Sequence, residues 1–281
     1  MHIFYTVIEL KTYLLELRLK KAKIGFVPTM GALHQGHCSL ISTAKKENDY
    51  VVCSIFVNPT QFNDKKDLEK YPRNLERDKE ILQAAHCDIL FAPSQEEMYP
   101  SIDNTKFDFG NLDMVMEAKF RPGHFNGVAL IVKKLFNIVE PRSAYFGQKD
   151  FQQLLIIKHL VKMLQIPVTI VACPIFRESD GLAMSSRNVF LSPEERKNAP
   201  VIAQTLFSLK KTFSHFTINE LKAWVKQQIN KSDLMELEYF EIANSQTLLP
   251  IENIKETKHV VACIAVKFNK LRLIDNIILF P

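Results

Sequence analysis

Strand-like and helix-like segments alternate along the first 175 residues, and this alternation limits the folds open to the chain. Apolar runs rich in β-branched and aromatic residues cover 23–28, 50–57, 87–92, 143–147 and 167–174. Stretches with helical spacing of apolar residues cover 6–20, 39–47, 74–86, 127–139 and 151–164. Strands separated by helices pair in parallel, so the pattern predicts an α/β fold with a Rossmann-like, doubly wound parallel sheet.

The C-terminal third has a different pattern. Helical stretches at 193–213 and 217–231 come before strand-like runs at 236–243, 259–268 and 271–279. We therefore expect a smaller C-terminal α+β domain, with residues 1–175 in the first domain and 176–281 in the second. All eight glycines lie at or before Gly181. Backbone that turns sharply or approaches a ligand closely needs glycine, so we expect the chemistry in the first two thirds of the chain.

The composition is ordinary for a soluble globular protein, with 47% apolar and 24% charged residues among 281. Five cysteines without a C-x-x-C pair indicate buried thiols in a reducing compartment. No basic segment precedes the apolar N-terminus, and no apolar run approaches the ~20 residues that span a bilayer. We expect a cytoplasmic protein. Because the net charge of +5 is spread along the chain, we expect neither nucleic acid nor a membrane as partner.

Four of the strand-like runs are each followed at once by a polar loop. These loops read "PTMGALHQGH", "NPTQF", "GQKD" and "PIFRESDGLAMSSRN". In open parallel sheets the ligand crevice lies beyond the carboxyl ends of the strands. All four loops are therefore expected at one edge of the sheet, where they would line a common site.

The first loop leads into a helix and carries His34 and His37 around Gly36. A helix start offers unpaired N–H groups and the positive end of a dipole, which suits an anion. Gly31 and Gly36 would let the backbone approach a phosphate, and the histidines would add donors. The loop is neither a P-loop nor a G-x-G-x-x-G turn. A simple helix cap remains open, whereas zinc is disfavoured because no further ligands lie at a recognisable spacing.

The other loops supply complementary groups. Lys149 follows a strand end, and its point charge suits a phosphate oxygen. Gln153 lies one helical turn further on, where its amide suits a polar substrate. Ser185 to Arg187 follow a glycine-containing stretch that could close over a polyphosphate. Asn58 and Gln61 are amides that recognise hydroxyl and carboxylate groups without adding charge. Asp78 is a candidate ligand of Mg²⁺. Each segment also has a plain alternative. Lys149 would be a surface lysine, and residues 185–187 would belong to a polar linker. Asn58 and Gln61 would lie in an ordinary turn, and Asp78 would form a surface ion pair.

Taken together, these stretches resemble the pantothenate synthetases (pantoate–β-alanine ligases) of the H-x-G-H nucleotidyltransferase superfamily. The matching segments occur in order over the first 190 residues: "VPTMGALHQGH", "SIFVNPTQF", "YPRNLERD", "RPGHFNGV", "KLFNIVEP", "FGQKDFQQL" and "ESDGLAMSSRN". The resemblance implies that ATP and pantoate form an enzyme-bound pantoyl adenylate and pyrophosphate. β-Alanine then attacks the acyl carbon, which releases pantothenate and AMP. It also implies Mg²⁺ with ATP, a homodimer, a nucleotide- and pantoate-binding domain over 1–175 and a lid domain over 176–281.

The resemblance also implies roles for individual residues. His34, His37 and Lys149 would be catalytic, with His37 as proton donor and Lys149 on the phosphates. Gln61, Gln153 and Asn58 would bind pantoate and β-alanine, and Asp78 would help hold Mg²⁺. The ATP-binding residues would be Met30, Gly31, Ala32, Leu33, His34, Gln35, Gly36, His37, Gly147, Gln148, Lys149, Asp150, Phe176, Met184, Ser185, Ser186 and Arg187.

Several positions depart from the usual family pattern. Gln35 and Gln148 stand where the family usually has Glu, Cys38 where it has Leu, and Phe176 where a smaller aliphatic residue is common. Two other functions stay open on the residues alone. One is a different H-x-G-H nucleotidyltransferase that joins a nucleotide to a phosphomonoester, and the other is a non-catalytic nucleotide-binding module. The neutral amides in "NPTQF" and "FQQ" favour a small hydroxy acid over a phosphomonoester.

Overall fold

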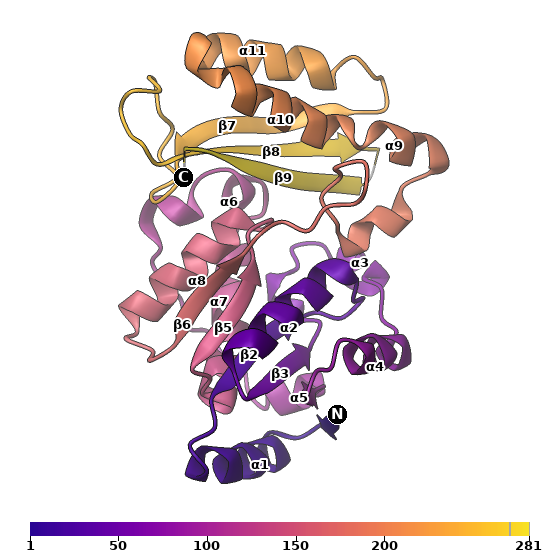
Figure 1. Cartoon of the computed structure of the whole chain (residues 1–281), viewed down its shortest axis with the longest axis vertical. Helices are drawn as coiled ribbons and strands as arrows, with labels where there is room; N and C mark the ends of the chain where they lie inside the picture. Colours follow the sequence, from indigo (N-terminus) through magenta and orange to yellow (C-terminus); the bar gives the residue numbers. More distant parts are fainter. Residues whose placement is uncertain (270, 281) are drawn as a thin grey trace. The chain divides into compact units, whose positions relative to one another are not determined.

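A six-stranded, all-parallel sheet forms the centre of the first part of the chain (Figure 1). The computed structural model describes residues 1–269 and 271–280. The strands are β1 (His2–Phe4), β2 (Ile24–Thr29), β3 (Tyr50–Ile55), β4 (Ile89–Phe91), β5 (Ser143–Gly147) and β6 (Thr169–Cys173), in the order β1-β4-β3-β2-β5-β6. The predicted α/β parallel sheet is therefore confirmed.

The edge strand β1 was absent from the prediction. It has three residues and pairs in parallel with β4 through His2↔Ile89, Ile3↔Leu90 and Phe4↔Phe91. A three-residue segment is too short to show an alternating pattern. Its strand conformation depends on pairing with a partner that lies far away in the sequence.

The order in which the chain adds strands to the sheet reverses at β2. From β2 the chain continues to its neighbour β3 and then to β4, whereas β5 pairs with the other side of β2 and leads on to β6. In open α/β sheets a ligand crevice forms outside the carboxyl ends of the strands at such a reversal. The loop after β2, which carries the two histidines, starts at this point.

Helices cover both faces of the sheet. The longer helices of this part are α1 (Val7–Leu19), α2 (Gln35–Glu47), α4 (Leu75–Ala84), α7 (His124–Val139) and α8 (Phe151–Met163). The shorter ones are η1 (Pro59–Gln61), α3 (Lys65–Lys70), α5 (Gln95–Met98), η2 (Gly110–Asp113) and α6 (Glu117–Phe120).

Successive residues of a strand pack into two separate hydrophobic cores. Phe26 packs in a cluster with residues of α1, α7 and α8. Its neighbour Val27 belongs to a second cluster with residues of α2 and α4. Side chains alternate between the faces of a strand, so this division defines the two sides of a doubly wound sheet.

The C-terminal part has an antiparallel sheet in the order β7-β8-β9. Its strands are β7 (Glu236–Asn244), β8 (Val260–Phe268) and β9 (Leu271–Phe280), and its helices are η3 (Ser186–Phe190), α9 (Pro193–Asn198), α10 (Val201–Thr212), η4 (Phe213–His215) and α11 (Ile218–Ile229). Apolar side chains of α10, α11 and the three strands share one core. The expected small α+β arrangement is confirmed, although the helical stretch 193–213 is interrupted at Ala199 and Pro200.

The described chain divides into two compact units. The first comprises Met1–Asp113, Glu117–Gln148 and Gln153–Pro174, and the second comprises Met114–Met116, Lys149–Gln152 and the chain from Ile175 onward. The functional roles expected for domains 1–175 and 176–281 stay predictions. Among the helices described here, none combines the length and the apolar character needed to cross a membrane.

Candidate active site

His34 and His37 cap the N-terminus of α2. His34 is the residue before the helix, and its Nδ1 accepts the Gly36 N–H at 3.1 Å. His37 Nδ1 accepts the His34 N–H at 3.2 Å. Each side chain thus satisfies a backbone donor that the helix leaves unpaired. The simple helix-cap interpretation is correct as far as it goes, because both imidazoles cap the helix.

These two hydrogen bonds also fix the chemistry of the rings. A neutral imidazole has one nitrogen that donates and one that accepts. Because Nδ1 accepts in His34 and in His37, the hydrogen of each neutral ring is on Nε2. The ring centroids lie 4.1 Å apart. The helix start therefore carries two adjacent Nε2–H donors that need no positive charge.

The loop before α2 bends through left-handed backbone. Gly31 has φ +81° and Ala32 has φ 51°. A Cβ at Gly31 would lie 2.9 Å from Asp78 Oδ2 and 3.0 Å from Ile55 Cγ2, so only glycine fits there. The turn brings the N–H groups of Ala32 and Leu33 to one carboxylate, 2.9 Å from Asp78 Oδ2 and 2.7 Å from Asp78 Oδ1.

Asp78 has a position unlike that of an exposed metal ligand. Its side chain lies in the first turn of α4 and is 2% exposed, and each carboxylate oxygen accepts one loop N–H. Burial raises the pKa of this carboxyl, and the two N–H bonds lower it. Mg²⁺ keeps several waters in an octahedral shell, which does not fit this enclosed carboxylate. Among the described residues, no cluster of three His, Cys, Asp or Glu side chains has metal-binding geometry.

Gln61 is held by contacts from two other segments and from Asn58, which precedes η1. Its Nε2 donates to Met30 Sδ at 3.2 Å, which joins η1 to the loop after β2. Its Oε1 accepts from Asn58 Nδ2 at 3.1 Å, and its backbone carbonyl lies 2.8 Å from His124 Nδ1. Gln61 is 7% exposed. The amide of this predicted pantoate ligand is thus oriented by the protein itself.

Asn58 uses its side-chain amide to hold Gln61 in that orientation. Its Oδ1 accepts from Tyr99 Oη at 2.7 Å and from Thr60 Oγ1 at 3.1 Å. Its Nδ2 donates to Gln61 and, at 3.0 Å, to the Gly127 carbonyl. The side chain is 1% exposed. Asn58 stays a predicted substrate residue, but its contacts give it the role of a support for Gln61.

Tyr99 and His124 are supporting residues that the sequence analysis did not single out. Both lie far from Gln61 along the chain, and no local pattern links them to it. The only sequence signal is that His124 belongs to "RPGHFNGV", one of the segments that match the family.

Other residues of the first unit that the sequence analysis named lie at the end of β5 or in the helices that follow β2 and β5. Gly147 is the last residue of β5, and the Gln148 N–H donates to the Cys173 carbonyl at 2.8 Å. Gln153 is half-buried in the first turns of α8. Gln35 is exposed at the start of α2. Cys38 is half-buried and burial raises the pKa of its thiol, whereas the other four cysteines are buried, as expected.

The remaining predicted residues belong to the second unit. Residues 176–184 form a small hairpin in which Met184 N–H donates to the Phe176 carbonyl at 3.0 Å and Glu178 N–H to the Leu182 carbonyl at 2.9 Å. Gly181, with φ +93°, makes the turn. We call this segment the 176–184 hairpin. Arg196 holds it through ion pairs with both Glu178 and Asp180, at 2.6 and 2.7 Å.

Directly after the hairpin, Ser185 caps η3 by accepting the Arg187 N–H at 3.3 Å. Ser186 and Arg187 lie in η3. Lys149 is the first residue of another segment of this unit, with its side chain 18% exposed and Nζ 3.8 Å from Asp150 Oδ1. The cationic and hydroxyl groups expected around a polyphosphate therefore lie in the second unit, and the histidines and Gln61 lie in the first.

The first unit is a doubly wound α/β protein in which a histidine-capped helix starts at the reversal of strand order. The family model described as Pantoate-beta-alanine ligase matches residues 2–278. Pantothenate synthetases of Porphyromonas gingivalis and Bacteroides fragilis are 52% and 51% identical over 277 residues, which is 99% of this chain and 99% and 98% of theirs.

Solved structures agree with these sequence matches. The crystal structure of pantothenate synthetase from Thermus thermophilus has a TM-score of 0.93, 42% identity and full coverage of both chains. A pantoate–β-alanine ligase from Francisella tularensis, complexed with beta-gamma ATP and β-alanine, has a TM-score of 0.82 and 36% identity, with 99% of this chain and 98% of that chain covered. The chain belongs to the pantoate–β-alanine ligase family.

Proposed function

We propose that this chain condenses pantoate with β-alanine at the expense of ATP, through an enzyme-bound pantoyl adenylate. A pantoate carboxylate oxygen attacks the α-phosphorus of ATP, and pyrophosphate leaves with the electron pair of the broken P–O bond. The amine of β-alanine then attacks the acyl carbon, loses a proton and displaces AMP. The observation that carries the proposal is the histidine pair at the start of α2, together with membership of the family.

In the first step, negative charge develops on the phosphate oxygens. Donors that are already aimed at such oxygens lower the barrier, because they need no reorganisation during the reaction. We assign this role to the Nε2–H groups of His34 and His37, with His37 as the proton donor. The capping bonds of their Nδ1 atoms support the assignment, since they hold both rings in the required tautomer.

Pantoate recognition is assigned to Gln61 and Gln153, with Asn58 in support. A positioned amide can donate to a carboxylate and accept from a hydroxyl. The hydrogen bond from Asn58 Nδ2 to Gln61 Oε1 selects one orientation of the Gln61 amide, with Nε2 on the side of Met30. A fixed amide supplies the orientation that a reaction between two bound small molecules requires.

ATP recognition is assigned to both units. In the first unit it comprises Met30, Gly31, Ala32, Leu33, His34, Gln35, Gly36, His37, Gly147 and Gln148. In the second unit it comprises Lys149, Asp150, Phe176, Met184, Ser185, Ser186 and Arg187. Lys149 would neutralise phosphate charge, and residues 185–187 would contact the departing pyrophosphate.

Mg²⁺ is expected to enter on the phosphates of ATP, where it would neutralise charge. The enclosed position of Asp78 disfavours a direct bond to the ion, and we assign no step to the metal. A homodimer and a cytoplasmic location are further expectations from the family. Light scattering tests the first, with about twice the mass of one chain as the expected result.

Exchange of labelled pyrophosphate into ATP tests the proposed reaction. With pantoate present and β-alanine absent, we expect pantoate-dependent exchange, followed by AMP and pantothenate when β-alanine is added. Folded protein that binds ATP without any exchange would instead favour another acceptor acid or a non-catalytic nucleotide-binding module. Transfer of a nucleotide to a phosphomonoester would favour a different H-x-G-H nucleotidyltransferase.

A further inference from the structure

The last strand, β9, carries two buried polar side chains side by side. Asp275 is 4% exposed and Asn276 is 2% exposed. The Asn276 N–H donates to Asp275 Oδ1 at 2.7 Å. Buried polar groups need hydrogen-bond partners, and each of these two side chains also has a partner from outside the sheet.

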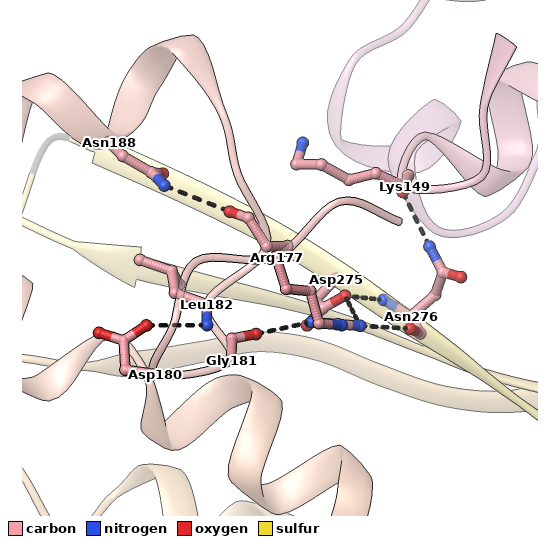
Figure 2. Close-up of polar contacts among 9 residues, drawn as sticks. Lys149, Arg177, Asp180, Gly181, Leu182, Asn188, Asp275 and Asn276 are labelled. Carbon is pink, nitrogen blue, oxygen red and sulfur yellow. Dashed lines mark hydrogen bonds and ion pairs between the residues drawn. The ribbon is translucent and has the colours of Figure 1, made fainter. Parts of the chain in front are cut away.

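Asp275 binds Arg177 at the base of the 176–184 hairpin (Figure 2). The guanidinium donates from Nη1 to Asp275 Oδ2 at 2.7 Å and from Nη2 to Oδ1 at 2.9 Å. Nη1 also donates to the Gly181 carbonyl at 3.0 Å, which fixes the turn of the hairpin. The guanidinium carbon lies 4.9 Å from the centre of the Phe207 ring. One side chain therefore joins both ends of the hairpin to β9 and α10.

Asn276 holds the backbone at Lys149. Its Nδ2 donates to the Lys149 carbonyl at 2.8 Å. Figure 2 shows the Lys149 side chain extending away from Asn276, with its ammonium group at the far end. All of these residues belong to the second unit. Two neighbouring residues of β9 thus hold the two segments of this unit that carry the expected ATP-binding groups.

The stability of the fold does not by itself explain the buried ion pair between Arg177 and Asp275. Removing two charges from water is costly, and a buried ion pair often stabilises a protein no better than apolar residues of similar volume. Burial raises the pKa of the Asp275 carboxyl, while the Arg177 guanidinium acts in the opposite direction. A bidentate pair does, however, impose a defined geometry that apolar contacts do not.

We propose that Asp275 and Asn276 are positioning residues for ATP, which set the 176–184 hairpin and Lys149 in a fixed relation to each other. The inference rests on the proposed function, because it takes Lys149 and residues 184–187 as ligands of ATP. Neither β9 residue contacts substrate in this proposal. They act by removing the freedom of groups that would otherwise have to be ordered when ATP binds.

The test is a double variant, Arg177→Met with Asp275→Leu, which removes both charges together and keeps the volume. If the pair had only a structural role, the folded variant would have normal kinetics, whether its melting temperature rose or fell. We expect a folded protein whose KM for ATP rises at least about tenfold in pyrophosphate exchange, with the KM for pantoate within about twofold of the wild type. A folded double variant with the wild-type KM for ATP would overturn the proposal.

A matched control exists in the same sheet. Arg272 of β9 binds the buried carboxylate of Glu238 in β7. Arg272→Met with Glu238→Leu removes another arginine–carboxylate pair from the same strand, together with the 3.0 Å contact between Glu238 and Lys267. Its KM for ATP should stay within about twofold of the wild type. Equal increases in both double variants would overturn the proposal, because they would mean that any damage to this sheet weakens ATP binding.

Asn276→Ala decides the matter if the Arg177 double variant does not fold. It removes the bond to the Lys149 carbonyl and no charge. We expect a loss of about five- to tenfold in kcat/KM for ATP at an unchanged KM for pantoate, and an unchanged kcat/KM would overturn the proposal. Wild-type protein that shows no pantoate-dependent exchange would contradict the proposed function instead, whatever the variants do.

Discussion

His37 Nδ1 accepts the backbone N–H of His34 at 3.2 Å, while His34 Nδ1 accepts the N–H of Gly36 at 3.1 Å. The two histidines therefore cap the helix that they are proposed to use for catalysis. The helix cap uses one nitrogen of each imidazole, and the proposed catalysis uses the other. Nδ1 holds the backbone, and Nε2 carries the hydrogen that a phosphate oxygen would accept.

Replacement of His34 by Asn should separate these two roles. Asn is among the best residues for a helix N-cap, so the melting temperature should fall by less than about 2 °C. The imidazole Nε2–H is lost, and adenylate formation should decrease by about 10²-fold, as for a lost donor to the transition state. Pyrophosphate exchange and thermal unfolding measure the two effects.

Replacement of His34 by Ala is the comparison. It should decrease adenylate formation to a similar extent and also cost about 1 kcal/mol of stability through the lost cap. Near-normal exchange in the Asn variant would remove the His34 imidazole from the mechanism.

Tyr99→Phe tests how the orientation of Gln61 is maintained. The variant removes the 2.7 Å hydrogen bond to Asn58 Oδ1 and leaves the weaker bond from Thr60. The KM for pantoate should rise about threefold to tenfold, the effect of losing about 1 kcal/mol from one hydrogen bond. The KM for ATP should change little. Kinetics with each substrate varied in turn measure both.

Asn58→Asp is the stronger form of the same test. It places a carboxylate oxygen opposite Gln61 Oε1 and the Gly127 carbonyl, so that acceptors face acceptors. Pantoate use should then be nearly lost. Tyr13→Phe on α1 is the control, since its ring packs against His2 and Phe4 of β1. If all three variants raised the KM for both substrates alike, the support assigned to Asn58 would be incorrect.

Gly127→Ala should damage the proposed pantoate site by displacing the backbone of η1. The added Cβ would overlap the Thr60 carbonyl oxygen, so η1 must shift. Alanine favours the helix by about 1 kcal/mol, but the overlap should exceed this and leave the protein about 1–3 kcal/mol less stable. The KM for pantoate should rise as Gln61 moves. Urea unfolding and substrate kinetics measure the two effects.

Gly110→Ala is the control for that variant. Its Cβ would meet no described atom within 4 Å, and only its φ of +54° is unfavourable. It should lose about 1 kcal/mol of stability with unchanged kinetics. A normal KM for pantoate in a Gly127→Ala protein of reduced stability would contradict the assignment of Gln61 to pantoate.

Asp103 should contribute to stability in a pH-dependent way. Hydrogen bonds from Thr105 and Lys134 lower the pKa of its carboxyl to about 2. The unfolded value is about 3.9, so the contribution is fully present above about pH 4 and is lost as the pH falls through about 2. Partial exposure reduces the expected effect of Asp103→Asn to about 1 kcal/mol at pH 7.

The free energy of unfolding in urea at pH 7 and near pH 2 tests this. Wild type and Asp103→Asn should differ at neutral pH and converge in acid. A difference that stays constant over this range would assign the effect to packing.

The sequence by itself determined the layers of this protein. Buried strands such as Tyr50–Ile55 alternate with amphipathic helices, and this local pattern is sufficient to define a parallel α/β sheet. It also placed His34 and His37 at a helix start after a central strand. These inferences succeed because strand, helix and capping preferences act over a few neighbouring residues.

Only the tertiary structure decided which residues support the site. Asp78 binds backbone 46 residues away, Tyr99 binds Asn58 41 residues away, and Asn276 binds the Lys149 carbonyl 127 residues away. The polar residues of β9 lie outside the first two thirds of the chain, where the position of the glycines predicts the chemistry. A side chain's neighbours from distant segments depend on how the whole chain packs, and no local periodicity records them.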